Sequence, residues 1–325
     1  MKILMIRLDK IGDLVCTLPV DQATFLKEHN ITWLIQDGMQ FILNHAKPRR
    51  TFQVINKNKQ LHSFLILLDL LKNQHFDMAI SFQCPWWVHL ALWVRKVSIR
   101  VGALSQWHSF LFLNKGLRQI RSESSQHEAD YNFDLVRHAF DIKVKMPNPI
   151  LNMYVEDEPY FLQRFNLEQN NYIVVHPGMA GSALNWPQMK YIQFIENEKM
   201  NSKIVITGTP ADEFWLTEIK DHFKNDSQVL ILQNQLNTTQ LLQILKHAKY
   251  VLAPSTGVLH LAASLGTSIK GIFSPIQVHR PTRWGARGNG EIEHYIPTIN
   301  CPQTHNCVQE KCPHYNCMEK LNVTV

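Results

Sequence analysis

The sequence predicts an α/β protein made of two successive halves, each a parallel sheet with helices on both faces. Short apolar runs typical of buried strands alternate with amphipathic stretches at helical spacing along most of the chain. The alternation breaks at residues 146–149, where two prolines stand within four residues, and then restarts. We therefore predict an N-terminal domain over residues 1–148 and a C-terminal domain over residues 149–325.

The first half begins with an apolar run at residues 2–6 and a glycine-bearing loop, after which a helix is expected to start near Asp13. Pro19 lies inside that helical pattern and should shorten or bend the helix. Further strands are predicted at residues 32–35, 52–55, 78–82 and 99–102, and further helices at residues 40–46, 61–71, 86–94 and 127–140.

The second half repeats the alternation. Strands are predicted at residues 172–175, 203–207, 229–232, 249–252 and 269–273. Helices are predicted at residues 156–165, 188–195, 240–248 and 258–266. Thr238 is the expected cap of the third of these helices, and Gly266 the expected end of the fourth.

Composition restricts the classes of function. The net charge of +6 is too weak to indicate nucleic-acid binding, but it is compatible with an anionic substrate or a membrane surface. No signal sequence and no run of about 18 apolar residues is present, so we expect a cytoplasmic protein that at most rests on a membrane. Basic residues cluster in the first half, at Lys47, Arg49 and Arg50, at Arg95, Lys96 and Arg100, and at Arg118 and Arg121.

Four of the six cysteines crowd the C-terminal tail, at Cys301, Cys307, Cys312 and Cys317. In a cytoplasmic protein such cysteines are typical of thiols or metal ligands rather than disulfides. Their spacing, with five, four and four residues between them, is not that of a zinc ribbon. We expect no metal site.

The stretch A-P-S-T-G-V-L-H at residues 253–260 follows a predicted strand and opens a predicted helix. Ser255 and Thr256 are good N-cap types, and Gly257 lets a ligand approach the backbone. Free N–H groups and the positive end of a helix dipole favour a phosphate or diphosphate here. An ordinary strand–turn–helix corner is the alternative.

Other candidate residues also fall at the carboxyl ends of predicted strands, where α/β sheets gather ligands. They are His176, Pro177 and Gly178 after one strand, and the turn at residues 208–213 after the next. Asp13 has the corresponding place in the first half, either as a helix cap or as a carboxylate facing a ligand. Two such domains facing each other would form one cleft.

These motifs together resemble those of glycosyltransferase family 9, the lipopolysaccharide heptosyltransferases. The first is K-I-L-M-I-R-L-D-K-I-G-D at residues 2–13, and the strongest later one is T-G-x-x-H-L-A-A at residues 256–263. Between and after them, F-D, R-V-G, an H-x-x-D-x-N-like helix, H-P-G, W-P and C-M follow at residues 76–77, 100–102, 127–132, 176–178, 186–187 and 317–318.

The resemblance implies a GT-B fold, that is, two Rossmann-like domains, and an inverting transfer from a nucleotide-diphosphate sugar without metal or cofactor. Asp13 then matches the general base. Thr256, Gly257 and His260 match residues that hold the donor diphosphate. An acidic residue of the Asp212-Glu213 turn matches a contact to the donor nucleoside.

The resemblance further implies a lipid-linked glycan acceptor, the lipopolysaccharide inner core, bound by the first domain at the cytoplasmic face of the inner membrane. Two positions depart from the family pattern: Leu184 stands where the family often has Lys, and Ser255 where it usually has Asp. Arg280, Arg283 or Arg287 would then supply a cation. These departures motivate one alternative, a catalytically silent nucleotide-sugar-binding or scaffold protein of the same pathway. A further alternative is another GT-B enzyme that hydrolyses or epimerises a nucleotide sugar.

Overall fold

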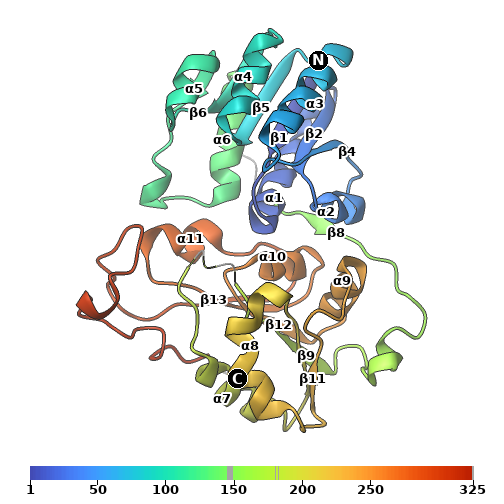
Figure 1. Cartoon of the computed structure of the whole chain (residues 1–325), viewed down its shortest axis with the longest axis vertical. Helices are drawn as coiled ribbons and strands as arrows, with labels where there is room; N and C mark the ends of the chain where they lie inside the picture. Colours follow the sequence, from blue (N-terminus) through green and yellow to red (C-terminus); the bar gives the residue numbers. More distant parts are fainter. Residues whose placement is uncertain (145–148, 180, 182, 324–325) are drawn as a thin grey trace. The chain divides into compact units, whose positions relative to one another are not determined.

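The computed structural model describes residues 1–144, 149–179, 181 and 183–323 (Figure 1). Most of the predicted linker at 146–149 lies outside the described residues. The chain forms two compact units. Unit 1 comprises residues 1–121 and 128–151, and unit 2 comprises residues 122–127 and 152–325.

Unit 1 is built on a six-stranded sheet in the order β4-β2-β1-β5-β6-β7, with all neighbours parallel. The central strand β1 is buried along Ile3 to Ile6, because it lies between β2 and β5. The strands are β1 (Lys2–Arg7), β2 (Asn30–Gln36), β4 (Thr51–Ile55), β5 (Met78–Gln83), β6 (Ile99–Ala103) and β7 (Lys115–Leu117).

Helices cover both faces of this sheet. The helices α1 (Ile11–Thr17) and α6 (Glu128–Phe140) pack against each other, whereas α3 (Gln60–Asn73), α4 (Trp86–Val94) and α5 (Trp107–Phe112) lie side by side (Figure 1). The chain crosses from β1 to β2 in one direction and from β4 to β5 in the other, so right-handed crossovers put α1 and α3 on opposite faces. α2 (Gln40–His45) follows β2.

Unit 2 has a second parallel six-stranded sheet, in the order β11-β10-β9-β12-β13-β14. Its strands are β9 (Tyr172–Val175), β10 (Lys203–Ile206), β11 (Val229–Ile231), β12 (Tyr250–Pro254), β13 (Ile269–Ile272) and β14 (Ile292–Tyr295). Its helices are α7 (Gln188–Glu198), α8 (Glu213–Phe223), α9 (Thr238–Lys246), α10 (Gly257–Ser264) and α11 (Pro281–Trp284).

The remaining elements are short. β3 (Ala46–Lys47) and β8 (Asn152–Met153) have two residues each. The 3-10 turns are Leu18–Gln22, Thr24–Leu26, Arg121–Glu123, Leu162–Phe165, Pro210–Asp212, Gln277–His279 and Gln309–Lys311. None of the helices in the described part of the chain has the length and apolar character needed to cross a membrane.

The predicted α/β class with two parallel sheets is confirmed, as is the early end of the first helix. α1 stops at Thr17, and Pro19 stands at the start of the 3-10 turn that follows. Two other predictions were wrong. Residues 156–165 form only the turn Leu162–Phe165, since Pro159 disfavours helix at its predecessor. The cap of α9 is Asn237, which accepts from the backbone of Gln240 at 2.9 Å, and not Thr238.

The C-terminal tail packs onto unit 2. Met318 and Leu321 are buried in its apolar core, and the indole of Trp186 donates to the carbonyl of Leu321 at 3.0 Å. Cys317 packs against the same core, and all six cysteines are free thiols. The tail therefore forms part of the folded unit.

Candidate active site

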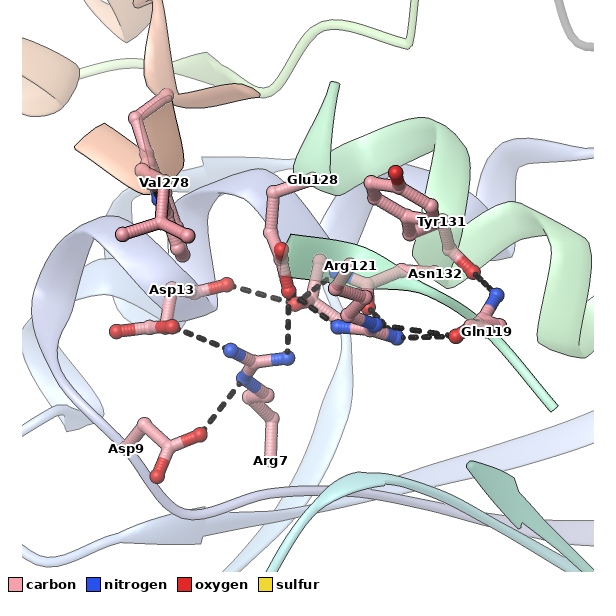
Figure 2. A network of polar contacts seen from close by, with 11 residues as sticks. Arg7, Asp9, Asp13, Gln119, Arg121, Glu128, Tyr131, Asn132 and Val278 are labelled. Carbon is pink, nitrogen blue, oxygen red and sulfur yellow. Dashed lines mark hydrogen bonds and ion pairs between the residues drawn. The ribbon is translucent and has the colours of Figure 1, made fainter. Parts of the chain in front are cut away.

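Arg7, the last residue of β1, organises the candidate site of unit 1 (Figure 2). Its guanidinium is buried and lies among three carboxylates. It pairs with Asp13, with Asp9 at 3.1 Å and with Glu128 at 3.5 Å. A buried charge is tolerated when it is paired in this way, so the sheet end, the following loop and α6 are tied together by one cation.

A second layer of hydrogen bonds supports this cluster (Figure 2). Arg121 lies 2.5 Å from Glu128 and donates to the amide oxygen of Asn132 at 3.3 Å. The amide of Asn132 donates to the hydroxyl of Thr17 at 2.9 Å, and that hydroxyl donates to the carbonyl of Asp13 at 2.6 Å. Hydrogen bonds through Thr17 therefore connect Asn132 of α6 to the backbone of Asp13 on α1.

The charges of the cluster balance one another. Burial alone would lower the pKa of Arg7, but the carboxylates of Asp13, Asp9 and Glu128 outweigh burial and hold its pKa above the usual value. Burial also raises the pKa of Asp9, against the opposing effect of Arg7. Arg7 therefore remains charged over the whole functional pH range.

Asp13 is the third residue of α1, and the residue at the N-cap position is Lys10, which makes no side-chain cap hydrogen bond. The Asp13 side chain is directed at Arg7, so the structure shows an ion pair and no capping bond. One carboxylate oxygen of Asp13 faces Arg7, while the other points away from it (Figure 2). The side chain is 20% exposed, which leaves it accessible to a ligand from solvent.

In unit 2, His176 directly follows β9 and is buried. Its backbone N–H donates to the carbonyl of Leu252, and its Nδ1 lies 3.0 Å from the hydroxyl of Thr207. Burial lowers the pKa of His176 to about 4, although the Asp212 carboxylate acts in the opposite direction. The ring is therefore neutral near pH 7.

Asp212 lies against Gly178, where a Cβ would come within 2.3 Å of the Asp212 Cγ. One Asp212 oxygen accepts from the backbone and the hydroxyl of Thr209, at 2.8 and 2.7 Å, and so caps the turn Pro210–Asp212. The structure thus brings together His176, Gly178 and Asp212. Glu213 instead pairs with Lys220 at 2.5 Å and has an exposed side chain.

Pro177 is fixed by a residue that the sequence analysis missed. Its carbonyl accepts from the amide of the buried Asn185 at 2.7 Å, and Asn185 in turn accepts from the backbone of Trp186 and the hydroxyl of Tyr191. The only signal for Asn185 in the sequence is its place directly before the W-P pair. Leu184 packs against the apolar core of unit 2.

The predicted anion site at the start of α10 has the expected backbone. Thr256 is the N-cap, and its hydroxyl accepts from the backbone of Val258 at 3.2 Å. Gly257 is the first helical residue, and Ser255 is fixed to the sheet by its N–H bond to Ile272. The first turn of α10 therefore leaves backbone N–H groups for an anion.

His260 is buried in the middle of α10, and burial, together with His127 and His294, lowers its pKa to about 3. Its ring is therefore neutral near pH 7. The ring of His127 lies 2.7 Å from the carbonyl of Gly285. His127 and His294 therefore add to the effect of burial in disfavouring a charge on His260.

The candidate residues of unit 2 share one edge of its sheet. β9, β12 and β13 are parallel neighbours, so the segments that follow them meet at the carboxyl edge. The segment after β13 carries Arg280 and Arg283. Arg280 donates to the carbonyl of Pro275 at 3.0 Å, and Arg283 lies over the ring of Trp284. Within residues 1–144, 149–179, 181 and 183–323, no group of three or more His, Cys, Asp or Glu is arranged to hold a metal ion.

Comparison with known proteins shows to which family this chain belongs. Glycosyltransferase family 9 (heptosyltransferase) matches residues 65–318. A Haemophilus influenzae protein provisionally named a glycosyltransferase is 28% identical over 87% of this chain and 85% of its own. The lipopolysaccharide core heptosyltransferase OpsX of the same organism is 22% identical over 88% of this chain and 81% of its own.

Solved structures agree on the fold. The family 9 glycosyltransferase of Veillonella parvula matches with a TM-score of 0.75 at 16% identity, over 91% of this chain and 85% of its own. The E. coli ADP-heptose heptosyltransferase II matches with a TM-score of 0.74 at 18% identity, over 92% of both chains. With its two parallel sheets and its match to the family over most of its length, this chain belongs to glycosyltransferase family 9 and is a glycosyltransferase with the GT-B fold.

Proposed function

We propose that this enzyme moves a heptose or another hexose-like unit from a nucleotide-diphosphate sugar to a hydroxyl of the lipopolysaccharide core or a related surface glycan, with inversion. The observation that carries the proposal is Asp13, an accessible carboxylate held by a buried arginine, for which the resemblance of the N-terminal motif implies the role of general base. The relatives named for lipopolysaccharide core heptosyl transfer, and E. coli WaaC solved with ADP, support the choice of substrates.

In the proposed step, the Asp13 oxygen that points away from Arg7 accepts the proton of the acceptor hydroxyl. The hydroxyl oxygen forms a bond to the anomeric carbon on the face opposite the diphosphate. The bond between that carbon and the diphosphate oxygen breaks, and the electron pair leaves with the nucleoside diphosphate. Arg7 fixes the direction of Asp13, which matters because a base works only within hydrogen-bond reach of the proton.

For the leaving group, we propose that Thr256 and Gly257 present the α10 N-terminus to the diphosphate. The loop of His176, Pro177 and Gly178, together with Ser255 and with His260 of α10, would complete the donor site, with Asp212 or Glu213 near the nucleoside. With Leu184 packed against the apolar core, Arg280, Arg283 or Arg287 is the proposed cation at the departing diphosphate.

The proposed acceptor is lipid-linked, so we also propose that the enzyme works as a peripheral protein at the cytoplasmic face of the inner membrane. We propose no nucleic acid as a partner. The net charge of +6 and the exposed members of the basic clusters of unit 1 favour a phosphorylated acceptor on an anionic surface. These members are Lys47, Arg49, Arg95, Lys96 and Arg118.

The test of the general base is Asp13→Asn, which keeps size and shape but removes the proton acceptor. We expect kcat to fall by about 10²–10⁴-fold with nearly unchanged donor Kd. Asp9→Asn is the matched control, because Asp9 pairs with the same arginine and should lose far less activity. Wild-type turnover of Asp13→Asn, or a reversed order of the two variants, would exclude Asp13 as the base.

A further inference from the structure

The helices on one face of unit 1 expose many large apolar side chains. Of the nineteen exposed large hydrophobic residues among those described, nine lie on α3, α4 and α5. All three exposed tryptophans of the described chain are in this set. The nine are Leu61, Leu65, Ile66, Trp86, Trp93, Val94, Trp107, Phe110 and Leu111, with exposed fractions between 41% and 74%. We call them the α3–α5 face.

Helical spacing places these side chains on one surface of each helix. Trp86 and Trp93 are two turns apart on α4, and Trp107, Phe110 and Leu111 stand at positions i, i+3 and i+4 of α5. The two helices are joined at the surface, since the rings of Trp86 and Trp107 lie 6.4 Å apart. The patch is therefore continuous from one helix to the next.

The apolar patch also continues from α4 to α3. Leu61 and Leu65 are one turn apart, and Arg95, at the end of α4, donates to the carbonyl of Leu68 on α3 at 2.9 Å. A helix row with its outer face this apolar is unusual for a surface that meets only water.

Positive charge accompanies the apolar side chains. On or directly beside α3 and α4, four exposed basic residues stand against one acidic residue of these helices, Asp69; the four are Lys59, Lys72, Arg95 and Lys96. Lys72 lies two turns after Leu65 on the same side of α3, and Arg95 and Lys96 directly follow Val94. All three are exposed. Aromatic and aliphatic side chains rimmed by Lys and Arg are typical of surfaces that lie in the headgroup layer of anionic membranes.

We propose that the α3–α5 face docks unit 1 onto an anionic lipid surface, with Trp and Phe side chains at the boundary of headgroups and acyl chains. Trp favours this boundary because its ring is apolar and its N–H is polar. A second copy of the chain fits the charge less well, since two surfaces of the same sign repel. This surface would hold the enzyme at the membrane that carries its proposed lipid-linked acceptor. In this respect the inference rests on the proposed function.

Sedimentation with vesicles tests the proposal on the full chain. Vesicles of phosphatidylcholine mixed with phosphatidylglycerol should bind the protein, and vesicles of phosphatidylcholine alone should bind it much less. Lys72→Glu with Lys96→Glu should lower the partition coefficient on anionic vesicles by at least about tenfold. Trp107→Ser with Leu111→Ser should lower it to a similar extent by removing the inserted apolar area.

Matched controls lie on unit 2. Phe214→Ser removes an aromatic side chain that is 74% exposed, and Lys224→Glu reverses an exposed charge that is not part of the α3–α5 face. Both should bind vesicles as the wild type does. Brominated lipids should quench the tryptophan fluorescence of the wild type, because three of its tryptophans would lie in the bilayer surface, and the quenching should fall in Trp107→Ser.

Three results would overturn the proposal: no vesicle binding by the wild type, equal binding by the face variants and the controls, or a dimer in light scattering that only the face variants dissociate. Transfer to a detergent-dispersed acceptor separates this surface from the chemistry. Face variants that lose vesicle binding but retain this transfer would support the face as a docking surface only. A wild-type protein that binds vesicles but transfers no sugar to this acceptor would count against the proposed function and leave the face in place.

Discussion

Arg7 serves three carboxylates at once, and this makes it a positioning residue for Asp13 rather than a group that touches substrate. Replacing it with Gln removes the cation from Asp13 and takes one arginine partner from the buried Glu128, which keeps Arg121, and breaking a buried ion pair typically costs about 3–5 kcal/mol. We expect Arg7→Gln to unfold at lower denaturant concentration and to turn over slowly.

Arg7→Lys distinguishes the effect of Arg7 on the orientation of Asp13 from its effect on the stability of the protein. Lysine keeps the charge but cannot offer a planar fork to Asp13 and Glu128 together. The variant should therefore remain folded, with kcat lowered and donor Kd unchanged, as measured by calorimetry and initial rates. A fall in kcat that only tracks the loss of folded protein would reduce Arg7 to a structural role.

The residues around Arg7 also show what the sequence could not reveal. Asp13 was found from its motif and its place at a helix start. Glu128 lies 121 positions from Arg7, and neither local spacing nor charge pattern indicates that the two meet. The sequence places Arg121 only in a basic cluster, whereas in the structure it binds Glu128, the carboxylate that Arg7 also contacts. Long-range pairs of this kind depend on the order of strands in the sheet.

At the scale of elements, α9 and α10 offer a controlled comparison, because each begins with a side-chain cap in unit 2. Thr256→Ala and Asn237→Ala should each cost about 1 kcal/mol of stability. Only Thr256→Ala should also weaken donor binding, since the α10 N-terminus is the proposed diphosphate site. Chemical denaturation and donor calorimetry on both variants make the measurement, and equal donor affinity in the two would argue against α10 as that site.

Elements with a clear apolar period were predicted well, and those fixed by other forces were not. The central strands β1, β9 and β12 follow continuous apolar runs, as buried parallel strands do. α5 and β7 were missed because they are short, and β14 because only part of it is apolar. The helix predicted at 156–165 failed at Pro159, and Asp157 instead binds Lys246 at 2.7 Å and His247 at 2.6 Å.

At the scale of the molecule, alternation alone leads to two parallel sheets, because each strand–helix–strand unit closes with the same hand. The sequence does not give the order of strands, which places the end of β1 in the middle of one sheet and the ends of β9 and β12 in the middle of the other. Those central strand ends carry Arg7, His176 and Ser255. The candidate residues thus follow from the motifs, while their neighbours follow from the topology.

The buried neutral histidines should make the stability of the whole molecule depend on pH. Burial lowers the pKa of His89 and His260 to about 3 and that of His176 to about 4. In the unfolded chain these rings take up protons near pH 6.5, so the unfolded state binds more protons below that pH, and stability falls as the pH falls toward 4. At pH 5 each ring should cost up to about 2 kcal/mol relative to pH 7. We expect the urea midpoint to drop steeply between pH 7 and pH 5, and His89→Gln to flatten that drop because it removes one of the three rings. A midpoint that stays constant over this range would show that the rings are protonated in the folded protein.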